Sequence, residues 1–317
     1  MVSTGTDREV VVRKVIYSCI EMYESFFGLK ELPFTLTPNT DFYYGLPPHQ
    51  EAMVVLKVAL ESGEGFIKVT GEVGTGKTLL LRKIMNSDIV DGYEIAYLPN
   101  PYLTAPEMRL ALAKELNVSL TASDEISVTD AINHRLIELN RSGKKVMVLI
   151  DEAQDLPDET LEAIRLFGNL ETESTKLVQI VLFGQPELDL RLAQDEFRQL
   201  RQRITFSYRL RSLTFDETRS YINYRLKVAG YQGSPLFSDK SMKKLWKGSR
   251  GIPRLINVLA HKSLMLAYGR GQYVVKPDAV RLAVNDTEDA VIKRRGVNVL
   301  LILAALMVIT VAALMVQ

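Results

Sequence analysis

The chain has 317 residues, which is enough for one large α/β domain and a smaller accessory domain. Its 39 lysine and arginine residues nearly balance 38 aspartate and glutamate residues and leave a formal net charge of +1. This balance argues against a dominant nucleic-acid surface, although it is compatible with a local basic patch, and we expect no nucleic-acid partner. The only cysteine, Cys19, excludes an intrachain disulfide bond.

The N-terminal part of the chain shows no targeting signal. Its apolar run, residues 10–20, is interrupted by Arg13 and Lys14 and lacks a cleavage site of small residues. Residues 1–21 are therefore either a disordered N-terminal extension or a product of start-site choice.

An aromatic cluster precedes the first predicted strand. Phe42, Tyr43, Tyr44 and His49 could line an adenine pocket. They could equally be core aromatics and a helix-capping histidine, which is the commoner role for any one of them.

Apolar runs typical of strands alternate with helical patterns between residues 65 and 210. This alternation predicts an α/β domain with a mainly parallel sheet, which we place at residues 22–210. The predicted strands cover residues 65–70, 93–98, 145–150, 177–183 and 204–210. The predicted helices between them cover residues 77–86, 105–116, 128–140, 158–166 and 186–200.

No strand pattern follows Leu210, and start signals such as Thr214, Ser238 and Pro277 introduce helices instead. The predicted helices cover residues 215–229, 239–247, 253–268 and 277–284. They predict an all-helical lid domain at residues 211–285, followed by a basic juxtamembrane segment at residues 286–296.

A phosphate-binding loop, the P-loop, follows the first predicted strand and opens a helix. Its sequence, Gly71-Glu-Val-Gly-Thr-Gly-Lys-Thr78, fits the G-x-x-x-x-G-K-[ST] pattern. Glycines let backbone N–H groups curl around phosphates, Lys77 would reach the β- and γ-phosphates, and the Thr78 hydroxyl would bind Mg²⁺. The residues expected to bind the nucleotide here are Gly71, Glu72, Val73, Gly74, Thr75, Gly76, Lys77, Thr78 and Leu79.

Two carboxylates, Asp151 and Glu152, end the apolar run of residues 145–150. Such a run predicts a strand buried on both faces, and α/β sheets bind ligands at the carboxyl ends of their strands. Asp151 would hold Mg²⁺, directly or through water, and Glu152 would orient and polarise the attacking water. The alternative is a helix N-cap aspartate with a solvated neighbour, which the accompanying P-loop disfavours.

Polar and basic residues that could complete the site follow. Gln185 either touches the γ-phosphate and the attacking water or caps the helix that begins at Pro186. Arg198, Arg201 and Arg203 crowd the approach to the last strand, and Arg201 and Arg203 are candidates for arginine fingers that act on a neighbouring subunit. Solvated charges on a helix face are the commoner explanation for such arginines.

Arg254 occupies an unfavourable position for a cation. Pro253 marks a helix start, so Arg254 lies in the first turn, at the positive end of the helix dipole. A residue that breaks a local rule often serves a function. We therefore expect Arg254 to reach from the lid toward the nucleotide, with a tolerated surface arginine as the alternative.

The last part of the chain, residues 297–316, is a run of twenty residues whose polar side chains are Asn298 and Thr310 alone. A helix of this length spans ~30 Å, the thickness of the hydrocarbon core of a bilayer. Lys293, Arg294 and Arg295 precede the run, so the positive-inside rule places the N-terminal side in the cytoplasm. The sequence predicts a single-pass protein of the inner membrane that contacts membrane lipid through this helix.

Taken together, these motifs resemble those of AAA+ ATPases. The stretches 23–41 (YESFFGLKELPFTLTPNTD) and 63–78 (GEGFIKVTGEVGTGKT) resemble the general-secretion-pathway A branch of that family, and within it most closely the ATPases of MSHA pilus biogenesis. The resemblance covers roughly residues 22–290, and its opening motif is more specific than the P-loop, which many families share.

This resemblance implies a five-stranded sheet in the order 5-1-4-3-2, a helical lid, and ATP rather than GTP as the nucleotide, with Mg²⁺. It also implies ATP-dependent self-association as a ring, expected to be a hexamer. Secretion-pathway A proteins carry a periplasmic peptidoglycan-binding domain after the span. The sequence ends at Gln317, so we expect no such domain, which favours the pilus-linked relatives.

The predicted function is a membrane-anchored ATPase that hydrolyses ATP to support assembly of a type IV pilus or secretion complex. Its expected partners are inner-membrane assembly proteins and further copies of itself. Two alternatives stay open. One is an ATP-dependent oligomerising scaffold with slow turnover, and the other is a DNA-transposition-type ATPase, which would have no need of a membrane span.

Overall fold

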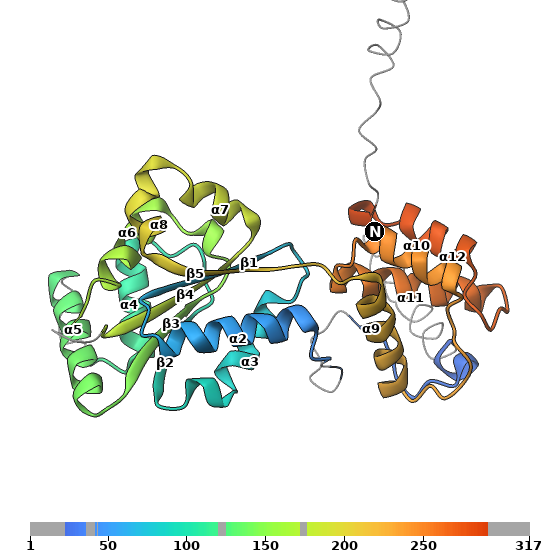
Figure 1. Cartoon of the computed structure of the whole chain (residues 1–317), viewed down its shortest axis with the longest axis horizontal. Coiled ribbons are helices and arrows are strands. Elements are labelled where there is room, and N and C mark those ends of the chain that lie inside the picture. The colour runs from blue at the N-terminus through green and yellow to red at the C-terminus, as the bar shows by residue number, and fades with distance from the viewer. Residues whose placement is uncertain (1–22, 36–41, 43, 120–124, 172–175, 291–317) are drawn as a thin grey trace, which may run out of the picture.

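The computed structural model describes residues 23–35, 42, 44–119, 125–171 and 176–290. Within these residues, an α/β domain lies beside a smaller helical domain (Figure 1). Two connections join the domains, one leading into α2 (Pro47–Glu61) and one leaving the last strand.

Five strands form a single parallel sheet in the order β2-β3-β4-β1-β5. They are β1 (Phe66–Gly71), β2 (Tyr93–Leu98), β3 (Lys145–Ile150), β4 (Val178–Gly184) and β5 (Ile204–Leu210). All five predicted strands are confirmed, with the first and the fourth displaced by one residue toward the C-terminus. The strand order agrees with the one that the resemblance implies.

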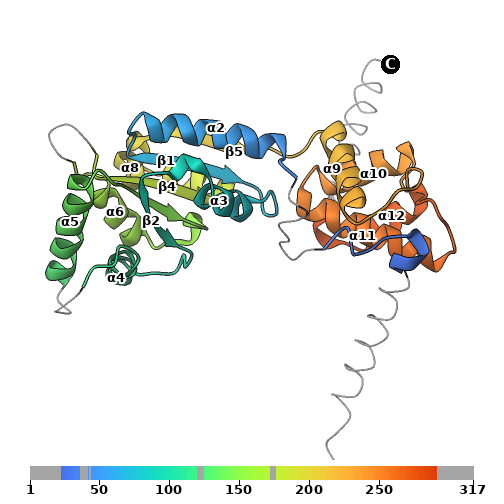
Figure 2. The ribbon, with the colours of Figure 1, turned by 90° about the horizontal axis from the view of Figure 1, so that it is seen from below.

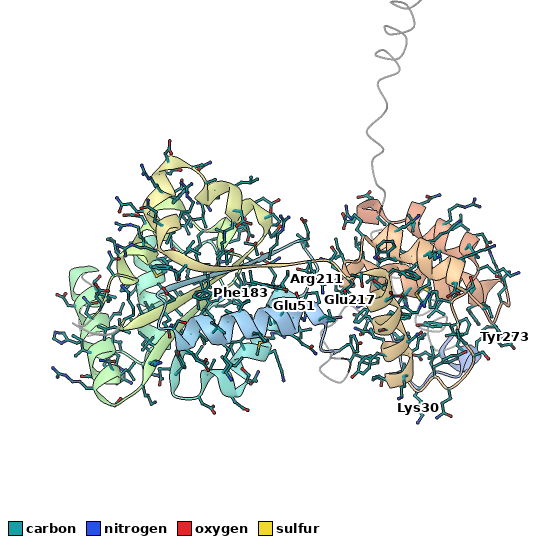
Figure 3. The ribbon with its side chains drawn as sticks, viewed as in Figure 1. Lys30, Glu51, Phe183, Arg211, Glu217 and Tyr273 are labelled. Carbon is teal, nitrogen blue, oxygen red and sulfur yellow. The ribbon has the colours of Figure 1, made fainter. Side chains whose placement is uncertain are left out.

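Helices cover both faces of the sheet (Figure 2). On one face lie α2 and α3 (Lys77–Met85), and on the other α4 (Ala105–Glu115), α5 (Glu125–Arg141) and α6 (Asp158–Phe167). Because both faces of the central strand β4 are covered, all its residues are buried, and Phe183 lies in the middle of the domain (Figure 3). Burial on both sides explains the continuous apolar runs of the inner strands β3 and β4, whereas the edge strand β5 alternates half-buried and exposed residues.

Two features of the α/β domain differ from the prediction. The sequence analysis did not identify α2, and the helix predicted at residues 186–200 is wrong as a single element. It divides into α7 (Pro186–Leu192), η4 (Asp195–Phe197) and α8 (Arg198–Arg203). The carbonyls of Leu192 and Ala193 accept hydrogen bonds from Arg201, at 3.2 and 2.7 Å, and so are satisfied by a side chain where α7 ends.

The helical domain follows β5. Its four predicted helices are all found, with ends within two residues of the prediction. They are α9 (Phe215–Val228), α10 (Asp239–Ser249), α11 (Pro253–Gly269) and α12 (Pro277–Asn285). Thr214 and Glu217 form a capping box at the start of α9, and the Ser238 side chain accepts from Ser241 N at the start of α10.

The described residues before α2 pack against the helical domain, although the prediction assigned them to the α/β domain. Tyr23, Phe27, Phe34 and Phe42 are buried in the same apolar cluster as helices α9 to α12. The buried Arg225 of α9 donates a hydrogen bond to the Pro33 carbonyl, and its guanidinium lies 4.8 Å from the centre of the Phe42 ring. The N-terminal segment is therefore part of the helical domain.

Among the helices that the structure describes, none has the length and apolar character needed to cross a membrane. The predicted span at 297–316 and the predicted N-terminal extension at 1–21 lie outside the described residues. The same holds for residues 291–296 of the predicted juxtamembrane segment.

Arg211, just after β5, links the two domains. It bonds to Glu51 of α2 at 2.9 Å and makes two hydrogen bonds to Glu217 of α9, at 2.8 and 2.9 Å. The Tyr208 hydroxyl also donates to Glu51, at 2.6 Å. Figure 3 shows Arg211 between the two carboxylates, where the domains meet. These ion pairs are partly exposed, so each contributes little to the free energy of unfolding. Their main effect is to fix the orientation of the two domains.

His49 supports the loop between β1 and α3 from α2. Its ring is 1% exposed, and its Nε2 lies 2.9 Å from the Thr75 carbonyl, to which it donates as Nε2–H. Nδ1 is buried without a partner, and burial lowers the pKa of the imidazole. The structure thus holds a neutral histidine, which is neither a helix-capping residue nor part of an aromatic pocket.

We expect the free energy of unfolding to fall as the pH drops below about 6.5, because His49 takes up a proton in the unfolded chain but not in the folded one. The contribution of His49 to the free energy of unfolding is complete above the pKa of the unfolded chain. Below that pKa it decreases by up to about 1.4 kcal/mol for each unit by which the pH falls. Urea unfolding at a series of pH values should show a shallower acid slope for His49→Gln. His261, also buried with a lowered pKa, contributes in the same direction.

The exposed His134 provides a matched control for this experiment. His134→Gln should leave the pH profile unchanged. Equal acid slopes for wild type and His49→Gln would contradict the assignment.

Candidate functional site

The P-loop connects β1 to α3 with a backbone that only small residues allow. Gly74 and Gly76 have φ values of +82° and +94°, a region that residues with a Cβ rarely adopt. A Cβ on Gly76 would lie 2.9 Å from the His49 ring, and one on Gly74 would lie 2.6 Å from Cβ of Arg254. The two glycines therefore serve both the curvature of the loop and its contacts with α2 and α11.

Lys77 is held inside the loop, at the first position of α3. It is 5% exposed, and its Nζ donates to the carbonyls of Gly71 at 2.8 Å and Glu72 at 3.4 Å. Burial lowers the pKa of Lys77, and the charges of Glu152 and Asp151 oppose that shift. A buried ammonium beside two carboxylates is suited to binding a polyanion that would replace the main-chain carbonyls as its partner.

The side chains of Thr78, on α3, and Asp151, directly after β3, contact each other at the carboxyl edge of the sheet. The Thr78 hydroxyl donates to Asp151 Oδ2 at 2.9 Å, and Asp151 Oδ1 accepts from Glu152 N at 3.0 Å. Burial raises the pKa of Asp151, and these hydrogen bonds and Lys77 oppose the rise. Asp151 is thus not a helix N-cap, and the buried pair supplies the hard oxygen donors that Mg²⁺ prefers, so these residues fit that ion.

Glu152 follows in a strained conformation. Its φ is +50°, which is unusual for a residue with a side chain and is typical of functional sites. The Glu152 carboxylate accepts from Gln154 Nε2 at 3.0 Å and from Gln185 Nε2 at 3.3 Å. Two amides from different elements thus hold the carboxylate that we expect to activate water.

Gln185 lies at the site, as one of the two predictions for it required. It occupies the N-cap position of α7, but its side chain makes no capping hydrogen bond and points to Glu152 instead. This excludes the capping alternative for its side chain. No contact tests its predicted role toward a γ-phosphate.

Gln154 is a residue that the sequence analysis missed. Its side chain is buried, donates to Glu152 and Asp155, and accepts from Gln185 N at 2.9 Å. It therefore connects the end of β3 to the end of β4. The available signal was its position, two residues after a carboxylate at the end of a buried strand.

Arg254, in the first turn of α11, lies next to the P-loop, and its reach toward the nucleotide stays a prediction. Its backbone N donates to the Gly74 carbonyl at 3.2 Å, and its side chain is exposed. Within the described residues, its guanidinium forms no ion pair. The start of α11 therefore contacts the phosphate-binding loop directly and leaves a free cation beside it.

The structure does not bring Arg201 and Arg203 to the P-loop of their own chain. They precede Ile204, which pairs with Phe66 at the start of β1, whereas the P-loop follows the end of β1. Six residues of strand separate the two ends by ~20 Å. Arg201 binds the carbonyls at the end of α7, and Arg203 lines a hollow with Glu171 and Lys176.

The predicted aromatic cluster belongs to the helical domain. Phe42 is buried under Arg225, and the Tyr44 ring lies 4.8 Å from that of Tyr224 on α9. These contacts are those of core aromatics and not of an open adenine pocket. Tyr43 lies outside the described residues.

Comparison with known proteins finds a matching family model and similar relatives. Residues 60–192 match the family model described as an AAA domain. General secretion pathway protein A of Aeromonas hydrophila is 40% identical over 263 residues, which cover 83% of this chain and 48% of that protein. The chain therefore spans about half the length of this relative.

Solved structures share the fold at low sequence identity. Cdc6p from Pyrobaculum aerophilum has a TM-score of 0.60 and 18% identity, with 83% of this chain and 70% of that chain covered. The ORC2 protein of Aeropyrum pernix, in ADPNP–ADP complexes, has a TM-score of 0.53 and 17% identity, with 79% and 72% covered. The α/β domain of this chain thus shares its fold with these proteins, and residues 60–192 within it match the AAA domain model.

Proposed function

We propose that this protein binds ATP with Mg²⁺ and hydrolyses it. The observation that carries the proposal is the meeting of Lys77, Thr78, Asp151 and Glu152 at the carboxyl ends of β1 and β3. The glycine-lined loop provides backbone N–H groups for phosphates, and the buried lysine provides a compensating charge. When bound, Mg²⁺ would neutralise charge that develops on the phosphates.

The residues of the chain would divide the remaining work. Lys77 would hold the β- and γ-phosphates, while Thr78 and Asp151 would hold the ion. Glu152 orients and polarises the attacking water, and Gln154 and Gln185 fix the direction of its carboxylate. Both amides bond to the same oxygen of Glu152, Oε2, which leaves Oε1 to accept a hydrogen bond from the attacking water.

The helical domain would act as the lid over the nucleotide. Arg254 supports this role, because the residue is exposed beside the P-loop and its guanidinium forms no ion pair with any residue that the structure describes. A bound triphosphate would attract this cation and α11 with it. Arg211 would transmit the movement through its bonds to both domains.

We further infer that the ATPase is anchored to the inner membrane by residues 297–316, self-associates as a ring, and supports assembly of a type IV pilus or secretion complex. The apolar run and the preceding cations support the anchor. The similarity to general secretion pathway protein A supports a role in secretion. In a ring, Arg201 or Arg203 would reach the phosphates of a neighbouring subunit.

Replacing Lys77 by alanine should remove nucleotide binding, because it takes away the buried charge that faces the phosphates. We expect a loss of about 2–5 kcal/mol in binding free energy, that is, at least roughly 30-fold in Kd. Titration of a fluorescent ATP analogue measures it, with exposed Lys114→Ala as the matched control. Unchanged affinity in a folded Lys77→Ala protein would refute the phosphate site.

Replacing Glu152 by glutamine should preserve ATP binding and lower steady-state hydrolysis by about 10²- to 10⁴-fold, because an amide cannot act as the base. The exposed Glu159 of α6 offers a matched control, Glu159→Gln, which should retain the wild-type rate. Equal rates for wild type and Glu152→Gln would favour the alternative, a nucleotide-dependent scaffold with slow turnover.

Removing residues 297–317 should move the protein from the membrane fraction to the soluble fraction. Fractionation followed by immunoblotting measures the distribution, and an unrelated apolar helix of the same length should restore membrane binding. If the shortened protein still sediments with membranes, the anchor lies elsewhere.

A further inference from the structure

Helix α10 presents a face of cations to solvent, of which Lys243 also lies over the Phe215 ring, 6.0 Å from its centre. We call it the α10 basic face; it consists of Lys240, Lys243, Lys244, Lys247 and Arg250, all exposed. The spacing of three, four and seven residues along the helix places the four lysines on one side. The opposite side, with Met242 and Leu245, is buried in the core of the helical domain.

The cations of this face are not neutralised within the described part of the chain. None of the five forms an ion pair there, and the single carboxylate of α10, Asp239, is bound by Arg219 at 3.2 Å. Glu217 at the start of α9 is likewise held by Arg211. A local positive patch therefore exists in a chain whose formal net charge is only +1.

Aromatic residues border the α10 basic face. Trp246 packs edge-to-face on Phe215 at 5.9 Å, and its indole N–H donates to the Leu213 carbonyl at 3.0 Å. An open hollow of about 620 Å³ lies beside it, with Leu213 and Trp246 in its apolar wall and Lys247 and Arg250 at its edge. Cations around an apolar wall match an amphipathic molecule with an anionic head.

The length of the remaining chain restricts where this face can lie. Ala290 is buried in the helical domain, and the predicted membrane span begins at residue 297. The six residues between them reach at most ~20 Å, even when fully extended. The helical domain therefore stays within one domain diameter of the bilayer, and charge attraction favours turning a basic surface toward anionic lipid.

We propose that the α10 basic face docks on anionic phospholipid at the membrane surface and holds the helical domain there. The proposal rests on the proposed membrane anchor. The phosphate groups of the lipid satisfy Lys240, Lys243, Lys244, Lys247 and Arg250, while Trp246 lies at the level of the head groups, where indole rings are enriched. Because α11 of the same domain contacts the P-loop, lipid composition then influences how readily Arg254 reaches the nucleotide.

The experiment uses the full-length chain in lipid nanodiscs and the fluorescence of Trp246, the only tryptophan in the protein. Nanodiscs of phosphatidylcholine alone are compared with nanodiscs that also contain phosphatidylglycerol. Anionic lipid should shift the emission to shorter wavelength and expose Trp246 to quenching by spin-labelled head groups. Raised salt should reverse both effects.

A variant with Lys240, Lys243, Lys244 and Lys247 changed to glutamine should lose the shift. The matched control changes four exposed lysines elsewhere, Lys57, Lys114, Lys227 and Lys276, and should keep it. Thermal unfolding followed by circular dichroism confirms that both variants fold. Full-length protein that does not co-purify with nanodiscs defeats the anchor itself, whereas protein that co-purifies without a lipid-dependent shift defeats only the docking proposal.

Other occupants of the face give different results. If duplex DNA shifts the emission of the detergent-solubilised chain and phosphatidylglycerol does not, the face is a nucleic-acid surface and the proposal is overturned. The proposal is also overturned if neither duplex DNA nor phosphatidylglycerol shifts the emission. In that case the α10 basic face would bind a protein partner.

Discussion

The site depends on the compensation of one buried positive charge. Lys77 cannot be desolvated without partners, so the chain places two main-chain carbonyls and two carboxylates around it. Parallel strands make this possible, because β1 and β3 deliver the loop and the carboxylates to the same edge of the sheet. The glycines, His49 and the start of α11 then fix the loop in the one shape that keeps the lysine among these partners.

Much of this arrangement could be predicted from local patterns. The inner strands β3 and β4 could be predicted because burial on both faces favours continuous apolar runs, and Arg254 because a cation in the first turn of a helix is unfavourable. Both signals lie within a few residues of sequence. Arg254, which conflicts with its local position, lies beside the P-loop, and Gln185, a polar residue at the end of a strand, lies beside Glu152.

What could not be predicted depends on contacts between distant segments. The assignment of Tyr23 and Phe34 to the helical domain follows from packing with helices some 200 residues later in the chain. The break after Leu192 depends on Arg201 reaching back to two carbonyls. The sequence around Gln154 does not distinguish a buried amide that links two strands from an ordinary surface amide. Its hydrogen bond with Gln185 depends on how the strands pair in the sheet.

The N-terminal segment has a mechanical consequence. Since it belongs to the helical domain, the polypeptide crosses between the domains twice, once before α2 and once after β5. A body attached at a single point can swivel in any direction, whereas one attached at two points turns mainly about the line through them. Any movement of the helical domain is thereby restricted mainly to rotation about one axis. Such a rotation would carry Arg254 toward or away from Gly74 along a single arc.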